Sequence, residues 1–138
     1  MLEKSKIKLT MMEDFNLIDA FRIVDVEGQG SVTAKQLQDG LNQFLGSYIM
    51  IGDIHLFMRV FDKDQDGRLK YSEFCDAFLP LDTSYAGKLA QKPPQEKFRN
   101  LDTFSRDPYT LQKMKEEMFV SETKSCFVEV WKTHVMIC

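Results

Sequence analysis

Four carboxylates spaced within one stretch of twelve residues are the side chains of this 138-residue sequence best suited to chemistry. Residues 62–73 read Asp-Lys-Asp-Gln-Asp-Gly-Arg-Leu-Lys-Tyr-Ser-Glu. Acids at the first, third, fifth and twelfth positions can surround a hard cation with the roughly six to eight oxygens that calcium requires. Gly67 permits the sharp turn in the middle of such a loop. The spacing therefore predicts a calcium-binding loop.

Each position of this loop has a definite role in the predicted site. The oxygens would come from three aspartate side chains, one backbone carbonyl and a closing glutamate that offers two oxygens: Asp62, Asp64, Asp66, Arg68 and Glu73. Lys70, at position 9, departs from the pattern because an ammonium group supplies no oxygen and cannot cap the following helix. We therefore expect a working site of moderate affinity.

A second stretch of the same length, Asp25–Gln36, repeats this pattern earlier in the chain with fewer charges. Asp25 and Glu27 are its only acids, and position 12 is Gln36, which offers one neutral oxygen. Gln36 is better explained as the capping-box partner of Thr33 at the start of a helix. We expect this first loop to hold no metal, so the predicted capacity is one calcium ion.

Four amphipathic segments must position the two loops, because apolar residues recur at helical spacing before and after each of them. A capping box of Thr10 and Glu13 predicts the start of the first helix. The second helix is expected to stop at Gly46 and the fourth at Pro80. The predicted fold class is all-α, with these four helices in residues 10–82 burying one shared core.

The two loops are expected to pair through Val32 and Leu69 in a short β-bridge. Outside the pair, residues 1–9 form a lysine-rich N-terminal segment. Residues 83–107, with two consecutive prolines and weak periodicity, are predicted to be an extended linker or strap. Residues 108–138 are predicted to be a helical tail, and their abrupt apolar ending suggests that the natural chain continues.

The tail carries an apolar stripe at helical spacing, formed by Phe127, Val130, Trp131, His134 and Val135. The sequence leaves open whether this stripe is plain core, a partner-facing anchor or a helix folded back into the groove of the paired loops. With Leu111, Met114 and Met118, it could also supply the apolar anchors that dominate protein interfaces.

Composition narrows the class of function. The net charge is −3, which offers no field for a nucleic-acid backbone, and no apolar run is long enough to span a membrane. Three widely spaced cysteines and two histidines support neither a disulfide framework nor a zinc site. The side chains show no constellation for nucleophilic catalysis. We expect a reduced, cytoplasmic, non-enzymatic protein.

With these residues in view, 10–82 resembles an EF-hand pair, one lobe of the calmodulin superfamily. That resemblance implies calcium binding by the five loop residues named above and docking of partner helices in a hydrophobic groove. The remaining residues are similar to tails of EF-hand subunits of ciliary axonemes, above all in Phe78–Asp82 followed by Tyr85 and Leu89, and later in Phe104 and Trp131. This similarity implies a protein partner, a cytoskeletal assembly and an axonemal location.

Three functions follow from the sequence. The first is a non-catalytic subunit that docks on a larger protein assembly through its tail and binds one calcium ion. The second is a calcium-responsive sensor that takes a partner helix in its groove. A simple calcium buffer is the third, although one credible site and a long tail fit it poorly.

Overall fold

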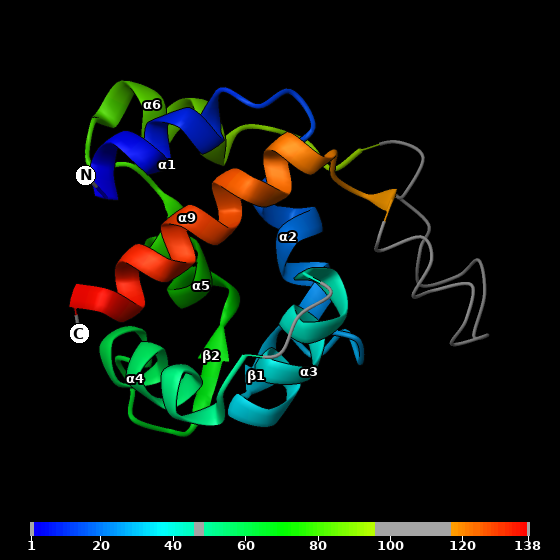
Figure 1. The fold of residues 1–138 in the computed structure, drawn as a ribbon, viewed down its shortest axis with the longest axis vertical. Coiled ribbons are helices and arrows are strands. Elements are labelled where there is room, and N and C mark those ends of the chain that lie inside the picture. Colours follow the sequence, from blue (N-terminus) through cyan, green and yellow to red (C-terminus); the bar gives the residue numbers. More distant parts are fainter. Residues whose placement is uncertain (1, 46–48, 96–116, 138) are drawn as a thin grey trace.

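The computed structural model describes residues 2–45, 49–95 and 117–137. Seven helices and two strands lie in these ranges (Figure 1). In chain order they are α1 (Leu2–Thr10), α2 (Leu17–Val24), β1 (Ser31–Thr33), α3 (Ala34–Leu45), α4 (Ile51–Phe61), β2 (Arg68–Lys70), α5 (Tyr71–Phe78), α6 (Thr83–Ala90) and α9 (Ser121–Ile137). None of the described helices is long and apolar enough to cross a membrane.

Two helix–loop–helix units form the centre of the fold, as the sequence predicts. The first runs α2, β1 and α3, and the second runs α4, β2 and α5. The strands pair antiparallel with Val32 directly opposite Leu69, and both side chains are fully buried. This register places the two loops side by side at one end of the molecule (Figure 1). The all-α fold class with a short β-bridge is confirmed.

The predicted start of the first helix at Thr10 is wrong. Thr10 ends an earlier helix, α1, and its hydroxyl donates to the Lys6 carbonyl at 2.9 Å. Asn16 instead caps α2, because its side-chain oxygen accepts from the Asp19 backbone N–H at 2.8 Å. The lysine-rich segment expected to precede the fold is therefore itself helical. The predicted stop at Gly46 lies outside the described residues.

The first part of the predicted extended linker is also helical. Residues 83–90 form α6, capped by the Asp82 carboxylate, which accepts from the Ser84 N–H at 2.9 Å. An aspartate at an N-cap is a local sign of a helix start, but the weak apolar periodicity of residues 83–107 predicts no helix after it. Residues 91–95 continue without helix, and the rest of the predicted linker lies outside the described residues.

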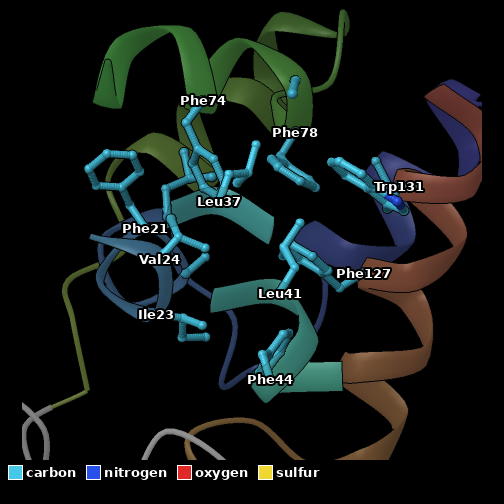
Figure 2. Packing of buried hydrophobic residues seen from close by; sticks show 14 of the residues in the cluster. Phe21, Ile23, Val24, Leu37, Leu41, Phe44, Phe74, Phe78, Phe127 and Trp131 are labelled. Carbon is cyan, nitrogen blue, oxygen red and sulfur yellow. The ribbon is translucent and has the colours of Figure 1, made fainter. Parts of the chain in front are cut away.

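The C-terminal helix α9 is part of the core. It packs against α1 and α4 and crosses the middle of the molecule (Figure 1). The Phe127 ring stacks on Phe78 at a centroid distance of 4.8 Å (Figure 2). The Trp131 ring lies 4.6 Å from the Phe57 ring. The sequence leaves three alternatives open for the apolar stripe. The structure shows a helix folded back onto the helices of the two helix–loop–helix units.

The connection between α1 and α2 holds two later segments of the chain, one after α6 and one before α9. The Lys92 ammonium donates to the carbonyls of Thr10 and Met12 at 2.6 and 2.7 Å. On the far side of the undescribed stretch, the Val120 N–H donates to the Asp14 carboxylate at 2.7 Å. One polar connection thus binds both Lys92, after α6, and Val120, directly before α9.

Candidate metal centre

Backbone geometry at the end of α4 forms the second loop. The Asp62 N–H closes the helix on the Met58 carbonyl at 2.8 Å. The chain then turns back through two residues in the left-handed region, Gln65 at φ 57° and Gly67 at φ 80°. The Gly67 N–H donates to the Asp62 carboxylate at 2.9 Å. The turn that the central glycine predicts is therefore present, and it orients the first carboxylate inward.

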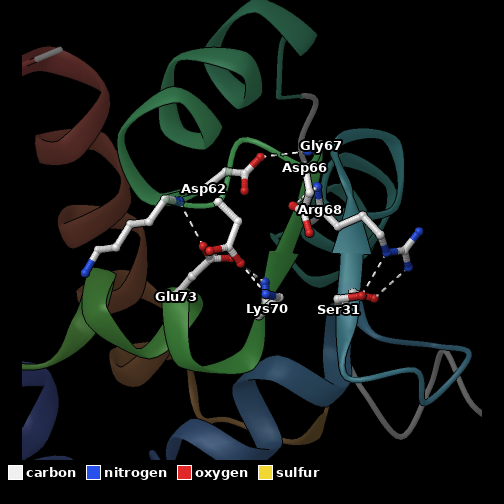
Figure 3. Close-up of polar contacts among 9 residues, drawn as sticks. Ser31, Asp62, Asp66, Gly67, Arg68, Lys70 and Glu73 are labelled. Atoms are coloured by element: carbon white, nitrogen blue, oxygen red, sulfur yellow. Dashed lines mark hydrogen bonds and ion pairs between the residues drawn. The ribbon is translucent and has the colours of Figure 1, made fainter.

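Glu73, in the first turn of α5, is buried and closes the loop (Figure 3). One of its oxygens accepts from the Lys70 N–H at 2.9 Å and the other from the Lys63 N–H at 2.8 Å. The first bond ties the exit helix to the strand, and the second ties it to the start of the loop. These two backbone N–H groups thus hold the Glu73 carboxylate at position 12, where it would close a metal site.

Both lysines of the loop form ion pairs, but only Lys70 pairs with an acid of the loop itself. The Lys70 ammonium contacts the Asp64 carboxylate, and this contact raises the pKa of Lys70. Lys63 pairs with Asp76 at 2.9 Å. The pKa of Asp66 is lowered, chiefly because its carboxylate accepts the Arg68 N–H. Lys70 supplies no side-chain cap to α5, as the sequence predicts.

The donor chemistry of the loop fits calcium. One Asp62 carboxylate oxygen is buried with no hydrogen-bond partner, although buried anionic oxygens are normally paired. The side chains of Asp62, Asp64, Asp66 and Glu73 and the Arg68 carbonyl would hold the ion, which is the predicted set. Within the described part of the chain these carboxylates do not converge into a ready cluster of three. Lys70 holds Asp64, and backbone N–H groups hold Glu73.

The first loop has the same frame but satisfies its own oxygens. Both Asp25 oxygens accept backbone N–H groups, from Gln29 at 3.0 Å and Gly30 at 2.9 Å. Gln36 accepts from the Thr33 N–H at 2.9 Å, while the Thr33 hydroxyl accepts from the Gln36 N–H at 3.2 Å. The predicted capping box is confirmed.

A contact that sequence reasoning missed joins the two loops. The sequence assigns Arg68 only a backbone carbonyl, yet its guanidinium donates to the Ser31 hydroxyl at 2.8 Å and to the Gln29 side chain at 2.9 Å. In the strand register Arg68 lies opposite Thr33, so its side chain reaches past that residue to Ser31 and Gln29. No feature of the sequence indicates this direction.

The cysteines and the buried histidine do not add to the metal centre. Cys75 and Cys126 are free and buried, and burial raises the pKa of each thiol. Cys138 lies outside the described residues. The ring of His134 lies among Phe57, Phe61 and Phe78, and its Nε2 is 2.5 Å from the Ala77 carbonyl.

Comparison with known proteins agrees with this geometry. Residues 14–79 match the family described as EF-hand domain pair. The chain is similar to Sorcin of Schistosoma japonicum, at 32% identity over 68 residues, which are 49% of this chain and 40% of that protein. It is also similar to the probable calcium-binding protein CML25 of Arabidopsis thaliana, at 37% identity over 59 residues, 43% of this chain and 31% of that one.

A third relative is calcium-dependent protein kinase 19 of Arabidopsis thaliana, at 31% identity over 77 residues, which are 55% of this chain but 13% of the kinase. The matches thus span less than half the length of each relative. No solved structure matches the chain significantly. Together with the two helix–loop–helix units and their β-bridge, these findings identify residues 14–79 as an EF-hand pair of the calmodulin superfamily.

Proposed function

We propose that this protein is a non-catalytic subunit of a larger protein assembly and binds one calcium ion in its second loop. The observation that carries the metal assignment is the buried, unpartnered oxygen of Asp62, in a loop whose sequence supplies three further carboxylates. In the first loop, by contrast, both Asp25 oxygens already accept backbone N–H groups. Calcium therefore has more to neutralise in the second loop than in the first.

Calorimetry tests the metal assignment directly. We expect a stoichiometry of one calcium ion per chain. A stoichiometry of two comparable ions, or none, would contradict the proposal. Amide signals of Gly30 and Gly67 in a nitrogen–proton spectrum identify the occupied loop, because each amide donates to the position-1 carboxylate of its own loop.

The subunit role is supported by the position of α9, which fills the surface where the sensor alternative would place a partner helix. Phe127, Val130 and Trp131 are each at least nine-tenths buried there. Burying such side chains contributes about 1.5–3 kcal/mol each. A calcium site at about one hundred times its dissociation constant contributes only about 2.7 kcal/mol. At that concentration, calcium binding alone would not offset the burial of all three side chains.

This position changes the expected mode of attachment. Met118, Phe127 and Trp131 are buried in the chain's own core, so they do not serve as exposed anchors in this structure. The prediction that Trp131 attaches the protein to its partner is therefore replaced by a structural role for Trp131. Leu111 and Met114 lie outside the described residues, and their part in attachment stays a prediction.

One contact favours the sensor alternative. The exit helix of the second loop, α5, carries both Glu73 and Ala77, and the Ala77 carbonyl contacts His134 of α9. A shift of Glu73 on metal binding would therefore be transmitted directly to the C-terminal helix. In this alternative the energy needed to move α9 would come from calcium together with a partner helix that replaces it.

Trp131 is the chain's only tryptophan, so its fluorescence separates the two roles. A constitutive subunit keeps Trp131 buried, and we expect the same emission maximum in calcium and in chelator. A red shift with calcium would show release of α9 and favour the sensor. Affinity isolation in both conditions extends the test to partners, because a subunit retains the same partner with or without calcium.

The cellular setting is a separate proposal. The tail's resemblance supports a cytoplasmic protein of the ciliary axoneme. Localisation of a tagged chain in ciliated cells tests this, and a signal excluded from cilia would contradict it without affecting the metal assignment.

A further inference from the structure

The guanidinium of Arg68 reaches from the second loop into the first (Figure 3). Nε donates to the Ser31 hydroxyl at 2.8 Å, while Nη2 donates to the Gln29 side-chain oxygen at 2.9 Å and to the Ser31 carbonyl at 3.0 Å. A single side chain thus binds three oxygens of a loop that lies 37 to 39 residues earlier in the sequence.

Two of these three oxygens occupy ligand positions. Counted from Asp25, Gln29 is at position 5 and Ser31 at position 7, where a loop of this type offers calcium a side-chain oxygen and a backbone carbonyl. A guanidinium carries a permanent positive charge and donates in a planar fork. It can therefore satisfy these oxygens at any calcium concentration.

The remaining ligand positions of the first loop are weak or engaged. Asp25 accepts two backbone N–H groups, and the Gln36 side-chain oxygen accepts a third. Glu27, at position 3, is exposed. With Arg68 in place, an incoming ion would have to displace a charge-assisted set of hydrogen bonds before it found its ligands.

We propose that Arg68 is the built-in cation of the first loop. It holds that loop in its folded form without metal and limits the EF-hand pair to one calcium ion. Its own backbone carbonyl is the position-7 oxygen of the second loop, so the same residue belongs to both sites. This inference rests on the proposed function, because it presumes that the second loop binds calcium.

The test restores the missing carboxylate with and without Arg68. Gln36→Glu keeps the bond to the Thr33 N–H, since Glu73 makes the equivalent bond to the Lys70 N–H in the second loop. We expect Gln36→Glu alone to bind one ion still. Gln36→Glu combined with Arg68→Met should bind two, with the Gly30 amide signal moving as the second ion enters.

A matched control tests whether Arg68 acts through its hydrogen bonds to Gln29 and Ser31 or only through its positive charge. Lys35 lies at position 11 of the first loop and pairs with Asp39 at 3.2 Å, away from the oxygens that Arg68 holds. Gln36→Glu combined with Lys35→Met removes one positive charge but leaves Arg68 in place. We expect first-loop affinity at least about tenfold weaker than in the Arg68→Met combination.

Two results would overturn the inference. One is a second ion bound by Gln36→Glu alone, and the other is no second ion bound by the folded Gln36→Glu, Arg68→Met variant. Trp131 emission and circular dichroism verify folding. If that variant does not fold, Arg68→Gln, which keeps an amide donor for Ser31, replaces it under the same criteria. Failure of the proposed function is distinct, because the unmodified chain would then show no calcium-dependent change at the Gly67 amide.

Discussion

The two loops share one backbone frame and differ in what neutralises their oxygens. In each, the position-6 glycine has a positive φ, 81° at Gly30 and 80° at Gly67, and donates to the position-1 carboxylate. The position-12 side chain accepts the position-9 N–H in both. In the first loop both Asp25 oxygens accept backbone N–H groups and Arg68 donates to Gln29 and Ser31, whereas the second loop retains a buried unpaired oxygen on Asp62. The backbone conformation of such a loop therefore does not by itself determine whether the loop can bind a metal ion.

The largest effect expected from this comparison is loss of binding on changing the second loop's closing residue. Glu73→Gln removes one charged oxygen and with it the acceptor for the Lys63 N–H, but it keeps an acceptor for the Lys70 N–H, so the tie between the exit helix and the strand should survive. We expect calcium affinity in calorimetry to fall on the order of 100-fold or more.

The equivalent change in the first loop is its control. Gln36→Ala removes the capping bond to Thr33 and should cost about 1 kcal/mol of folding stability, but it should leave calcium affinity nearly unchanged. Similar losses of affinity in Glu73→Gln and Gln36→Ala would mean that the loops are equivalent, contrary to the comparison.

A gain of affinity should follow from removing the competing cation in the second loop. Lys70→Asp frees the Asp64 carboxylate, adds an oxygen at position 9 and allows a side-chain cap on α5. We expect calcium binding to tighten by about 1–2 kcal/mol in calorimetry.

Lys63→Ala is the matched control, because Lys63 pairs with Asp76, outside the proposed ligand set. Its removal should change affinity only slightly. Unchanged or weaker binding by Lys70→Asp would show that another group already completes the shell.

The frame could be predicted from the sequence because it depends on local spacing. The length of each loop, its glycine at position 6 and the apolar residue between polar neighbours at Val32 and at Leu69 are all patterns among neighbours along the chain. The capping box of Thr33 and Gln36 was predictable for the same reason. At Thr10 the same reasoning failed, because a preceding helix extends through that residue and Asn16 offers a better cap.

The contacts that distinguish the loops could not be predicted because they join distant residues. Nothing local directs the Arg68 side chain to Gln29, since its length permits many directions. The placement of α9 has the same origin: an apolar stripe fits the chain's own groove or a partner's equally well. Only the assembled core decides, by stacking Phe127 on Phe78.

The exit helix of the second loop, α5, contacts a histidine of α9. This contact predicts that folding stability depends on pH. His134 packs among aromatic rings, donates from Nε2 to the Ala77 carbonyl, and faces Lys6. Desolvation lowers the pKa of His134 below its usual value, so the unfolded chain binds the proton more readily than the folded chain. Stability is therefore complete above the usual histidine pKa of about 6.5 and declines as pH falls below it.

Thermal unfolding at pH 7.5 and 5.5 measures this effect. The melting temperature of the unmodified chain should fall on acidification, and that of His134→Gln should fall less. The exposed His55→Gln is the matched control and should behave like the unmodified chain. An equal fall in all three would assign the acid sensitivity to other groups.

The smallest expected effect concerns position 4, where the loops differ in strain. Gly28 at φ 67° adopts the left-handed region freely, while Gln65 adopts it at φ 57° against a steric cost of about 1–2 kcal/mol. Gln65→Gly should stabilise the fold by about 0.5–1 kcal/mol, because relief of that cost exceeds the added freedom of the unfolded chain. Gly28→Ala should destabilise it by a similar amount, since open space around Gly28 leaves only backbone strain. Gly87→Ala, within α6, should have the opposite sign and stabilise the protein, because glycine lowers helix stability. Denaturant unfolding measures all three, and an unchanged midpoint for Gly28→Ala would remove the argument from strain.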